Sequence, residues 1–381
     1  MITVLQLVHK YRGNYELFNL QAGLDKQRFR MVVCYLSGSP DGRDRLVEVA
    51  DKVIYLQCRP DRLYWYNLPL LLKLREILDE EQPQVVNCQQ HRTTPLGILA
   101  RLLSRSKPVL VATLHGLGTA RSWQRRLSNW LLYRGFYRIV GISNGVSRDI
   151  VKSNWRLSSQ KVVTIQNGLD YTPFIAPIDR MQARAEVLPG KEGCFWFGTA
   201  GRLSKVKNQR TLIEAFAIVA ERIPESILVL AGKGELEEDL RSCIKNKGLD
   251  SRVFLIGYCS DMPLYLNSLD VFLLPSLREG FGLALVEAMA AGRPVIASTV
   301  GGIPEVVGDG AFARLVDPLD VKAMAEAMCT LAALTEDERM VLGEQARARA
   351  VNEFNAGRMV AGYAALYAEA YALWNRQGGR C

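Results

Sequence analysis

The chain has 381 residues, more than the ~250–300 at which a single hydrophobic core stops growing, and this length argues against one domain. A composition of 49% apolar and 23% charged residues excludes a disordered chain, and the lack of any apolar run near ~20 residues argues against a membrane-spanning helix. The net charge of +9 comes from residues 1–190, where 27 Lys and Arg outnumber 15 Asp and Glu. Residues 191–381 carry 21 Lys and Arg against 24 Asp and Glu. The two halves are therefore expected to meet different partners.

Short apolar runs rich in β-branched residues alternate with helical patterns through the first half. This alternation predicts βαβ units and a parallel sheet. Helices are expected between the strands, for example over residues 69–81. The expected strands cover residues 2–8, 31–36, 52–56, 85–87, 108–113, 138–143 and 161–167.

The pattern restarts near Cys194, after the irregular stretch 168–193, whose glycines and prolines predict a linker. Helices are expected over 208–222 and 235–247, and a final helical pattern over 353–374 carries an aromatic stripe. The expected strands cover residues 195–201, 226–232, 253–258, 271–276, 294–298 and 313–316.

These elements predict an α/β fold with two doubly wound domains, residues 1–175 and 176–381. Ligands of such sheets bind beyond the carboxyl ends of the strands, so a cleft between the domains is expected. The last helix, about 354–375, is expected to pack back on the N-terminal domain.

The eight cysteines are scattered, without a C-x-x-C pair, and we interpret them as free thiols in a reducing cytoplasm. The first residues, "MITVLQLVHKYRG", lack the basic start and the small-residue cleavage site of a signal peptide. A cytoplasmic location is therefore expected.

The segment "AGRLSKVKNQRTL" (200–212) ends a predicted strand at Gly201 and opens a helix near Asn208. Arg202 and Lys207 flank the polar loop between them. Two cations beside a helix N-terminus suit a diphosphate, because the helix supplies N–H donors and the side chains supply full charge. Taken alone the signal is weak, since surface loops often contain Arg and Lys.

The segment "LAGKGELEEDL" (230–240) places Gly232-Lys233-Gly234 between a strand and a helix. It has only two glycines, and no acidic residue follows at the distance that a dinucleotide fold requires, so an ordinary tight turn stays open. Lys233 and Glu235 are candidates for contact with a nucleotide base or phosphate.

The segment "LREGFGLALVE" (277–287) places Glu279 in a loop at the end of a strand and Glu287 in the following helix. Gly280 and Gly282 allow backbone N–H groups to approach an anion at the helix N-terminus. A surface carboxylate is the simpler interpretation of Glu279. Glu287, however, interrupts an apolar helix, where an unpaired carboxylate is costly to bury, so ligand hydroxyl groups are expected partners.

A further glycine turn, "STVGGIPEVV" (298–307), follows the next strand. Four strand–turn motifs then meet at one edge of one sheet, because the carboxyl ends of parallel strands share that edge. Together they predict a nucleotide-diphosphate site.

The ordered set "GRLSKVKN", "EGFGLALVEAMAAGRPVIAS" and "GGIPEVV" resembles the retaining glycosyltransferases of family 4, also called group 1, which have the GT-B fold of two Rossmann-like domains facing across a cleft. The family's E-x7-E element corresponds to Glu279 and Glu287. In the first half, "TLHG" (113–116), "GISNGVSRDI" and "IQNGLD" match more loosely. The family's Gly-Gly-x-Glu turn reads Arg12-Gly13-Asn14-Tyr15-Glu16 here, which keeps one glycine and the glutamate.

The resemblance implies a hexosyltransferase (EC 2.4) in which Arg202 and Lys207 neutralise the leaving diphosphate of a UDP- or GDP-sugar. It also implies that Glu287 accepts hydrogen bonds from the ribose, that Glu279 binds the transferred sugar, and that His115 reaches the donor sugar from the first half. The remaining donor-binding candidates that it implies are Gly13, Gly201, Gly232, Lys233, Gly280, Phe281, Gly282 and Leu283.

No convincing D-x-D metal motif is present, and the nearest acidic cluster, 79–81, ends a helix before Pro83 and is interpreted as a solvated face. We therefore predict catalysis without a metal or other cofactor, with the nucleotide sugar as co-substrate.

The segment "RSWQRRLSNWLLYRGFYR" (121–138) is basic and rich in Trp, and "RLYWYNLPLLLKLREIL" (62–78) is aromatic and leucine-rich. Such segments fit peripheral binding to an anionic membrane, although packed domain helices explain them equally well. The expected acceptor is a membrane-associated glycan of lipopolysaccharide or another surface polysaccharide. His9 and His91, at strand ends, are candidates for acceptor contact.

Three other functions stay open. A nucleotide-sugar epimerase of the same architecture needs no acceptor, and a non-catalytic sugar-nucleotide sensor needs no turnover. A nucleic-acid-binding protein explains the pI of 9.1, but no nucleic-acid module is recognisable and the second half is acidic, so no nucleic-acid partner is expected.

Overall fold

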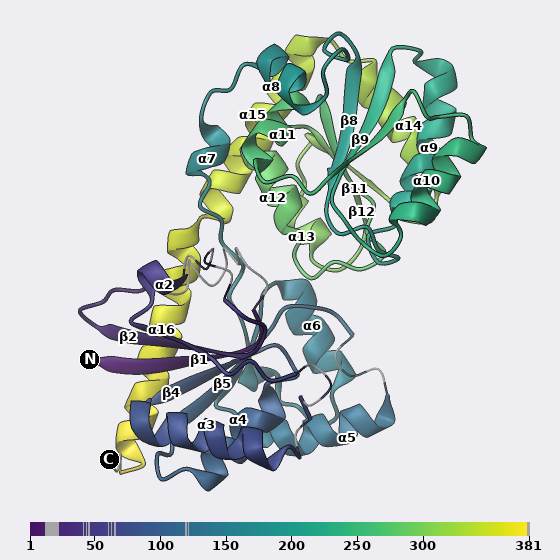
Figure 1. The fold of residues 1–381 in the computed structure, drawn as a ribbon. Coiled ribbons are helices and arrows are strands. Elements are labelled where there is room, and N and C mark those ends of the chain that lie inside the picture. The colour runs from purple at the N-terminus through teal and green to yellow at the C-terminus, as the bar shows by residue number, and fades with distance from the viewer. Residues whose placement is uncertain are drawn as a thin grey trace. The chain divides into compact units, whose positions relative to one another are not determined.

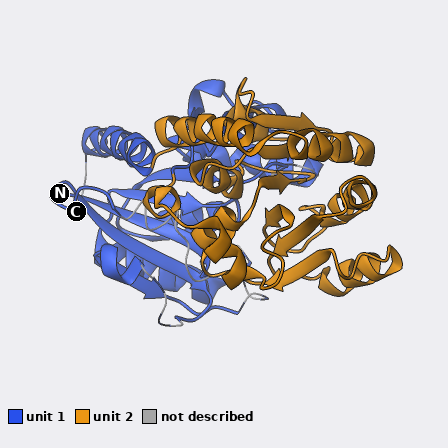
Figure 2. Cartoon of the chain, turned by 90° about the horizontal axis from the view of Figure 1, so that it is seen from above, with its two compact units in different colours: residues 1–168, 356–381 blue, residues 169–355 orange. Residues whose placement is uncertain are grey.

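The computed structural model describes residues 1–11, 23–40, 42, 44, 46–59, 61, 63–64, 66–118, 120 and 122–378. They form two compact units, coloured separately in Figure 2. Unit 1 is Met1–Gly168 together with the C-terminal segment that begins at Ala356, and unit 2 is Leu169–Asn355. Among the described residues, no helix combines the length and the apolar character needed to cross a membrane.

Unit 1 is built on a seven-stranded parallel sheet with the order β3-β2-β1-β4-β5-β6-β7. The strands are β1 Ile2–Lys10, β2 Phe29–Ser37, β3 Lys52–Tyr55, β4 Val85–Gln89, β5 Val109–Leu114, β6 Arg138–Gly141 and β7 Val162–Thr164. The helices described are α2 Leu46–Val49, α3 Leu68–Glu81, α4 Thr94–Leu103, α5 Trp123–Leu132, α6 Asn144–Ser153 and α16 Ala356–Arg376.

Helices α4 and α16 cover opposite faces of this sheet. Gln6 of β1 and Asn87 of β4 are register partners, and both donate to the hydroxyl of Tyr367 in α16 at 2.8 Å. The next residue of β4, Cys88, faces α4, because a Cβ added at Gly97 would lie 2.4 Å from its Sγ. Successive side chains of a strand alternate between faces, so one face receives α16 and the other α4.

Unit 2 is built on a six-stranded parallel sheet with the order β10-β9-β8-β11-β12-β13. The strands are β8 Phe195–Ala200, β9 Ser226–Ala231, β10 Val253–Gly257, β11 Val271–Leu274, β12 Val295–Ser298 and β13 Ala313–Val316. The helices are α7 Thr172–Ile175, α8 Arg180–Val187, α9 Gln209–Arg222, α10 Glu237–Asn246, α11 Met262–Ser268, α12 Leu283–Ala290, α13 Ile303–Val307, α14 Val321–Ala332 and α15 Glu336–Glu353.

The sheet of unit 2 lies between two layers of helices (Figure 1). Helices α9, α10 and α14 pack together on one side, and α8, α11, α12 and α15 pack on the other. The core between α9, α14 and the sheet consists of apolar residues such as Phe197, Phe216 and Met324, all fully buried. Burial on both faces explains why these strands are continuous apolar runs rather than alternating ones.

All thirteen strands expected from the sequence are present, each within three residues of the expected limits, and so are the three helices over 69–81, 208–222 and 235–247. Local signals agree with the structure. At the start of α3, for example, the Asn67 side chain accepts from Leu70 N at 3.2 Å and Pro69 occupies the first turn. The seven cysteines that the structure describes are free, as expected.

One expectation about an irregular segment differs from the structure. The stretch 168–193 is not an irregular linker throughout, because it contains α7 and α8. Asp179 caps α8 by accepting from Gln182 N at 2.8 Å. Helix α7 packs on α12, so the units divide at Gly168/Leu169 rather than at 175/176.

The helix expected over 353–374 is α16, Ala356–Arg376, which lies within three residues of the expected limits. Helix α15 ends at Glu353, and α16 begins at Ala356. Between them, the carbonyl of Phe354 accepts from Leu169 N at 2.8 Å, and Asn355 forms a bridge with Leu169. The chain passes from unit 2 to unit 1 at this break, and α16 packs on β1, β4 and β5 of unit 1.

Candidate active site

The predicted donor-binding residues follow four strands that are consecutive neighbours in unit 2: β9, β8, β11 and β12. Their carboxyl ends share one edge, and backbone hydrogen bonds join the loops there. Leu203 N donates to Lys233 O at 3.0 Å, and Gly302 N donates to Glu279 O at 3.1 Å. The fold therefore brings these four sequence motifs together.

Lys207 and Glu279 are in direct contact. Lys207 Nζ lies 2.6 Å from Glu279 Oε2, and the two side chains are 26% and 16% exposed. Ser276 Oγ donates to the same carboxylate oxygen at 3.2 Å. Arg202 is exposed on the same loop as Lys207. The site thus has one cation held by a carboxylate and a second that faces solvent.

Asn208 fixes the loop that carries both cations. It adopts the left-handed conformation (φ 56°), and its Nδ2 donates to Pro275 O at 3.1 Å and to Pro318 O at 2.7 Å. Leu277 N donates to Val206 O at 2.8 Å. These bonds tie the loop after β8 to the loop after β11, and so they position Lys207 against Glu279.

Two glycines allow the loops after β8 and β9 to touch. A Cβ at Gly232 would lie 2.0 Å from the carbonyl oxygen of Gly201, closer than any real contact. Gly232 has φ 148°, and its N–H donates to Gly257 O at 2.6 Å. The glycine turn predicted from the sequence is therefore required for close backbone approach.

Helix α12 begins at the same edge. Gly282 precedes it with φ 96°, in the left-handed region that favours glycine, and the helix runs from Leu283 to Ala290. Phe281 is 2% exposed and packs edge-on against Phe354, with ring centroids 5.4 Å apart. The half-buried Glu287 lies one turn into the helix. The first N–H groups of α12 present positive partial charge near Lys207 and Glu279.

His115 belongs to unit 1, where it follows β5 directly. Its Nε2 lies 2.7 Å from Gln89 Oε1, and Gln89 Nε2 donates to Gln6 Oε1 at 2.8 Å. Because Gln89 Oε1 is an amide oxygen and can only accept, His115 carries its proton on Nε2. Burial lowers the pKa of His115 to about 4. The imidazole is therefore neutral at physiological pH.

The polar residues that support His115 were not among the predicted site residues. Gln6, Asn87 and Gln89 are buried within strands, and Asn87 accepts from Thr113 Oγ1 at 2.9 Å. Tyr367 of α16 accepts from Gln6 and Asn87 and completes the network. Their position inside apolar strands was the signal in the sequence that could have identified them, because buried polar groups need hydrogen-bond partners.

The other two histidines lie at the same edge of unit 1, where the structure places His9 at the end of β1 and His91 after β4. Arg92 Nη1 lies 3.4 Å from His9 Nε2. Gly13, a predicted donor-binding residue, lies outside the described residues, as do Arg12 and Glu16.

The acidic cluster 79–81 is a solvated face only at Glu80, which is exposed, whereas Asp79 and Glu81 have partners within unit 1. Glu81 is 8% exposed and pairs with Arg30 at 2.7 Å and with Lys52. Asp79 accepts from Ser104 Oγ and from the backbone N–H groups of residues 105 and 106. Both carboxylates anchor neighbouring segments of unit 1. Within the described residues, no group of three or more His, Cys, Asp or Glu side chains is arranged to hold a metal ion.

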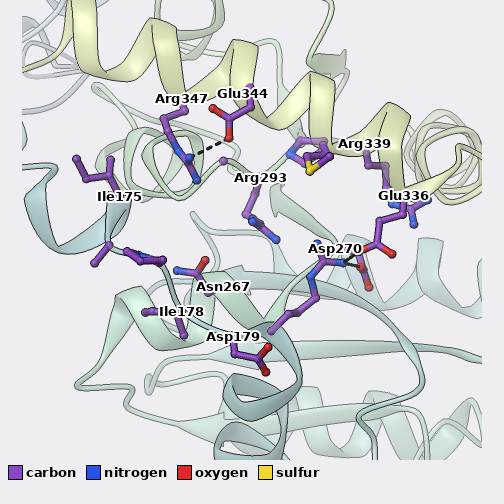
Figure 3. Close-up of a pocket in the computed structure, with 16 residues that line it drawn as sticks. Ile175, Ile178, Asp179, Asn267, Asp270, Arg293, Glu336, Arg339, Glu344 and Arg347 are labelled. Atoms are coloured by element: carbon purple, nitrogen blue, oxygen red, sulfur yellow. Dashed lines mark hydrogen bonds and ion pairs between the residues drawn. The ribbon is translucent and has the colours of Figure 1, made fainter.

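A cavity of about 480 Å³ lies at the opposite edge of the sheet of unit 2, where β11 and β12 begin (Figure 3). Asp270, 6% exposed, accepts from Arg184 at 2.6 Å and from Arg180 at 3.2 Å. Burial and the neighbouring Arg180 lower the pKa of Arg293, which points into the cavity, to about 10. No predicted donor residue that the structure describes lines this cavity. Its ion pairs join α8 to the sheet, which is a structural role.

Comparison with solved structures identifies the architecture. The crystal structure of HepE from Anabaena in complex with UDP and glucose aligns with a TM-score of 0.83 and 21% identity, over 97% of this chain and 100% of that chain. A glycosyltransferase from Rickettsia africae aligns with a TM-score of 0.81 and 19% identity, over 97% and 98%. The fold is GT-B, as expected.

Sequence comparison identifies the family. The family model described as Glycosyl transferases group 1 matches residues 184–349, and the model described as Glycosyltransferase Family 4 matches residues 17–172. The UDP-Gal:alpha-D-GlcNAc-diphosphoundecaprenol alpha-1,3-galactosyltransferase of Escherichia coli is 30% identical over 76% of both chains. A capsular polysaccharide biosynthesis glycosyltransferase of Staphylococcus aureus is 26% identical over 83% of this chain and 85% of its own length. The chain belongs to glycosyltransferase family 4 and is a hexosyltransferase.

Proposed function

We propose that this enzyme transfers a hexose, with retention of configuration, from a UDP- or GDP-sugar to a membrane-associated glycan acceptor in lipopolysaccharide or other cell-surface polysaccharide biosynthesis. The single observation that carries the donor half of the proposal is the Lys207–Glu279 contact at 2.6 Å. A cation for a diphosphate and a carboxylate for sugar hydroxyls lie side by side, as the two ends of a nucleotide sugar require.

The chemistry asks the protein for charge stabilisation. As the bond between the sugar C1 and the diphosphate oxygen breaks, the electron pair leaves with the diphosphate. The acceptor oxygen forms the new bond to C1 and gives up its proton. Arg202, Lys207 and the N-terminus of α12 lie where they can stabilise the growing negative charge, and such preorganised groups are the largest single contribution in many enzymes. We propose that these groups act without a metal.

The other candidates have binding roles in this proposal. Glu279 binds hydroxyl groups of the transferred sugar, and Glu287 binds those of the ribose. His115, whose Nε2–H is donated to Gln89, contacts the donor sugar from unit 1. The N–H groups of Phe281, Gly282 and Leu283 bind phosphate and sugar oxygens.

The acceptor half of the proposal is supported by the relatives and by the charge of unit 1. The relative from Escherichia coli is named for a diphosphoundecaprenol-linked acceptor, and the one from Staphylococcus aureus for capsular polysaccharide. The solved HepE structure holds UDP, which favours UDP as the nucleotide. We place the enzyme in the cytoplasm, associated peripherally with the inner face of the plasma membrane through the basic residues 1–190.

The donor is tested by thermal unfolding in the presence of a panel of nucleotide sugars. A ligand that binds only the native state raises the melting temperature, by an amount that grows with its affinity. We expect one UDP- or GDP-hexose to stabilise the wild-type protein, and the shift to persist in EDTA. Stabilisation by none of the panel would contradict the proposal. A shift in melting temperature that is lost in EDTA would show that donor binding requires a metal ion.

The same panel separates transfer from epimerisation. A transferase releases free nucleoside diphosphate at a rate that depends on the acceptor, whereas an epimerase converts the donor with no acceptor present. We expect acceptor-dependent release of UDP or GDP. Donor conversion at full rate without an acceptor would favour the epimerase.

A further inference from the structure

Unit 1 contains a groove of about 900 Å³ between α4 and α5, which we call the α4–α5 groove. Its apolar walls include Pro95 and Leu99 from α4 and Leu131 and Leu132 from α5, and Leu63 also lines it. Its volume is within the range of small-molecule binding sites. The lining residues of α5 recur at helical spacing and therefore form one continuous face of that helix.

The polar part of the groove carries positive charge. His91, Arg92 and Arg125 line it, and no described residue that lines it is acidic. Burial, followed by the charges of Arg125 and Arg92, lowers the pKa of His91 to about 4. The imidazole is therefore neutral, and Arg92 and Arg125 supply the positive charge of the groove.

Exposed apolar side chains continue from the groove onto the surface. Tyr64 and Leu131, which line the groove, are 51% and 56% exposed. Trp123 and Leu127 of α5 are 63% and 41% exposed. Exposed apolar residues in such a group usually mark a binding surface, and next to basic residues they suit a lipid–water interface.

The charged end of the groove adjoins the candidate active-site edge of unit 1. His91 follows β4 two residues after Gln89, whose side chain contacts His115. Arg92 contacts His9 at the end of β1. A ligand with its anionic group at Arg92 and Arg125 therefore has its polar end toward the carboxyl edge of the sheet and its apolar part along α4 and α5.

We propose that the α4–α5 groove binds the lipid carrier of the acceptor, with the phosphate or diphosphate at Arg92 and Arg125 and the hydrocarbon chain against Leu99, Leu131 and Leu132. The proposal rests on the proposed function, since it names the carrier of that acceptor. Charge complementarity selects this occupant. A free phosphate leaves the leucines uncovered, and an uncharged chain leaves two guanidinium groups without an anion.

The test measures direct binding of three probes to the full-length protein: farnesyl diphosphate, inorganic diphosphate and farnesol. Wild-type protein is expected to bind farnesyl diphosphate at least about tenfold more tightly than either other probe, because only this probe satisfies both parts of the groove. All measurements are repeated in the Lys207→Ala background, which weakens the competing diphosphate site of unit 2. Binding in the groove should persist there.

Two variants and two matched controls locate the site. In Arg125→Gln, farnesyl diphosphate should bind only slightly more tightly than farnesol, because the diphosphate loses its partner. In Leu131→Asp, farnesyl diphosphate should bind only slightly more tightly than inorganic diphosphate, because the chain loses its apolar wall. Leu102→Asp and Arg105→Gln change exposed residues near the end of α4 that do not line the groove, and both should bind like wild type. A melting temperature within about 2 °C of wild type shows that each variant is folded.

Three outcomes overturn the proposal: equal binding of all three probes, the same loss in variants and controls, or loss of all binding in Lys207→Ala. The last outcome assigns the probe to the donor site. Equal loss in Leu131→Asp and Leu102→Asp points to a general membrane-binding surface. Failure of the proposed function is seen separately, as absence of any stabilisation by nucleotide sugars in a protein that still binds farnesyl diphosphate.

Discussion

Lys207 and Glu279 are 72 residues apart in the chain, and their side chains form an ion pair of 2.6 Å at the carboxyl edge of one sheet. The pair joins the two motifs that the resemblance connects with the diphosphate and with the transferred sugar. Each side chain is still partly exposed, so both can be reached from solvent. The contact also implies that a change at either residue alters the charge that the other presents to a ligand.

Replacing Lys207 by Ala should lower the rate of sugar transfer by about 10²–10³, because it removes a charge that stabilises the leaving diphosphate. The measurement is release of nucleoside diphosphate at saturating acceptor. Lys205→Ala is the matched control, an exposed lysine of the same loop, and should keep the wild-type rate. A wild-type rate in Lys207→Ala would refute the diphosphate role.

Replacing Glu279 by Gln should separate turnover from nucleotide binding. The amide keeps the size of the side chain but frees Lys207 from its ion pair, so UDP or GDP should bind at least as tightly as to wild type. Turnover should fall by about 10²-fold or more, since a group near the reacting sugar is altered. Calorimetric titration and initial rates measure the two effects. Equal losses in both would argue that Glu279 mainly holds the loop.

Replacing Gly232 by Ala should push the loops after β8 and β9 apart, because the added Cβ would lie 2.0 Å from Gly201 O. We expect a KM for the donor raised at least about tenfold and a lower melting temperature. Gly193→Ala is the control, because a Cβ there meets nothing within 4 Å. Similar effects of both substitutions would show that the close approach is unimportant.

The neutral state of His115 predicts a pH dependence. Its pKa is about 4 in the folded protein and ~6.5 in an unfolded chain, so between these values the unfolded state binds a proton that the folded state does not. The free energy of unfolding should therefore fall as the pH falls from 6.5 toward 4, and less steeply in His115→Gln. Urea unfolding at several pH values measures this. An NMR titration of His115 near pH 6.5 would contradict it.

Replacing Asp270 by Ala should strongly destabilise unit 2. The change leaves the buried Arg184 guanidinium without its carboxylate, and breaking a buried pair in this way costs about 3–5 kcal/mol. Thermal unfolding measures the loss. Glu326→Ala, which breaks the exposed pair with Arg222, is the control and should leave unfolding unchanged. Donor binding by folded Asp270→Ala should be retained, because the network lies at the opposite edge of the sheet.

The strands and the order of motifs were predictable because they depend on short segments. Apolar β-branched runs form the buried strands, and residues such as Asn67 and Pro69 mark where helices begin. The start of the last helix was predictable to within three residues. The pattern was expected from residue 353, whereas α16 begins at Ala356, just after Phe354, whose carbonyl accepts from Leu169 N.

The candidate site was predictable where a residue's role follows from its place at a strand end, as for Arg202, Lys207 and Glu279. Asn208 was missed, because its importance lies in hydrogen bonds to Pro275 and Pro318 in other loops. Ser276 was missed although its partner, Glu279, lies in the same loop.

Gln89 and Tyr367 were missed for the same reason as Asn208. Gln89 contacts His115 directly across 26 residues of chain, and Tyr367 acts through Gln6, which is 361 residues away from it and contacts Gln89. No local pattern records such contacts.

The sequence by itself determined the α/β class, the strand ends at which the charged and glycine-rich turns lie, and the family, because each depends on local spacing along the chain. Only the tertiary structure decided that Lys207 pairs with Glu279 and that Asp79 and Glu81 are structural anchors. It also decided that leucines of α4 and α5 share one groove with two arginines, Arg92 and Arg125. These relationships depend on which segments become neighbours when the core is buried, and that outcome is a property of the whole chain.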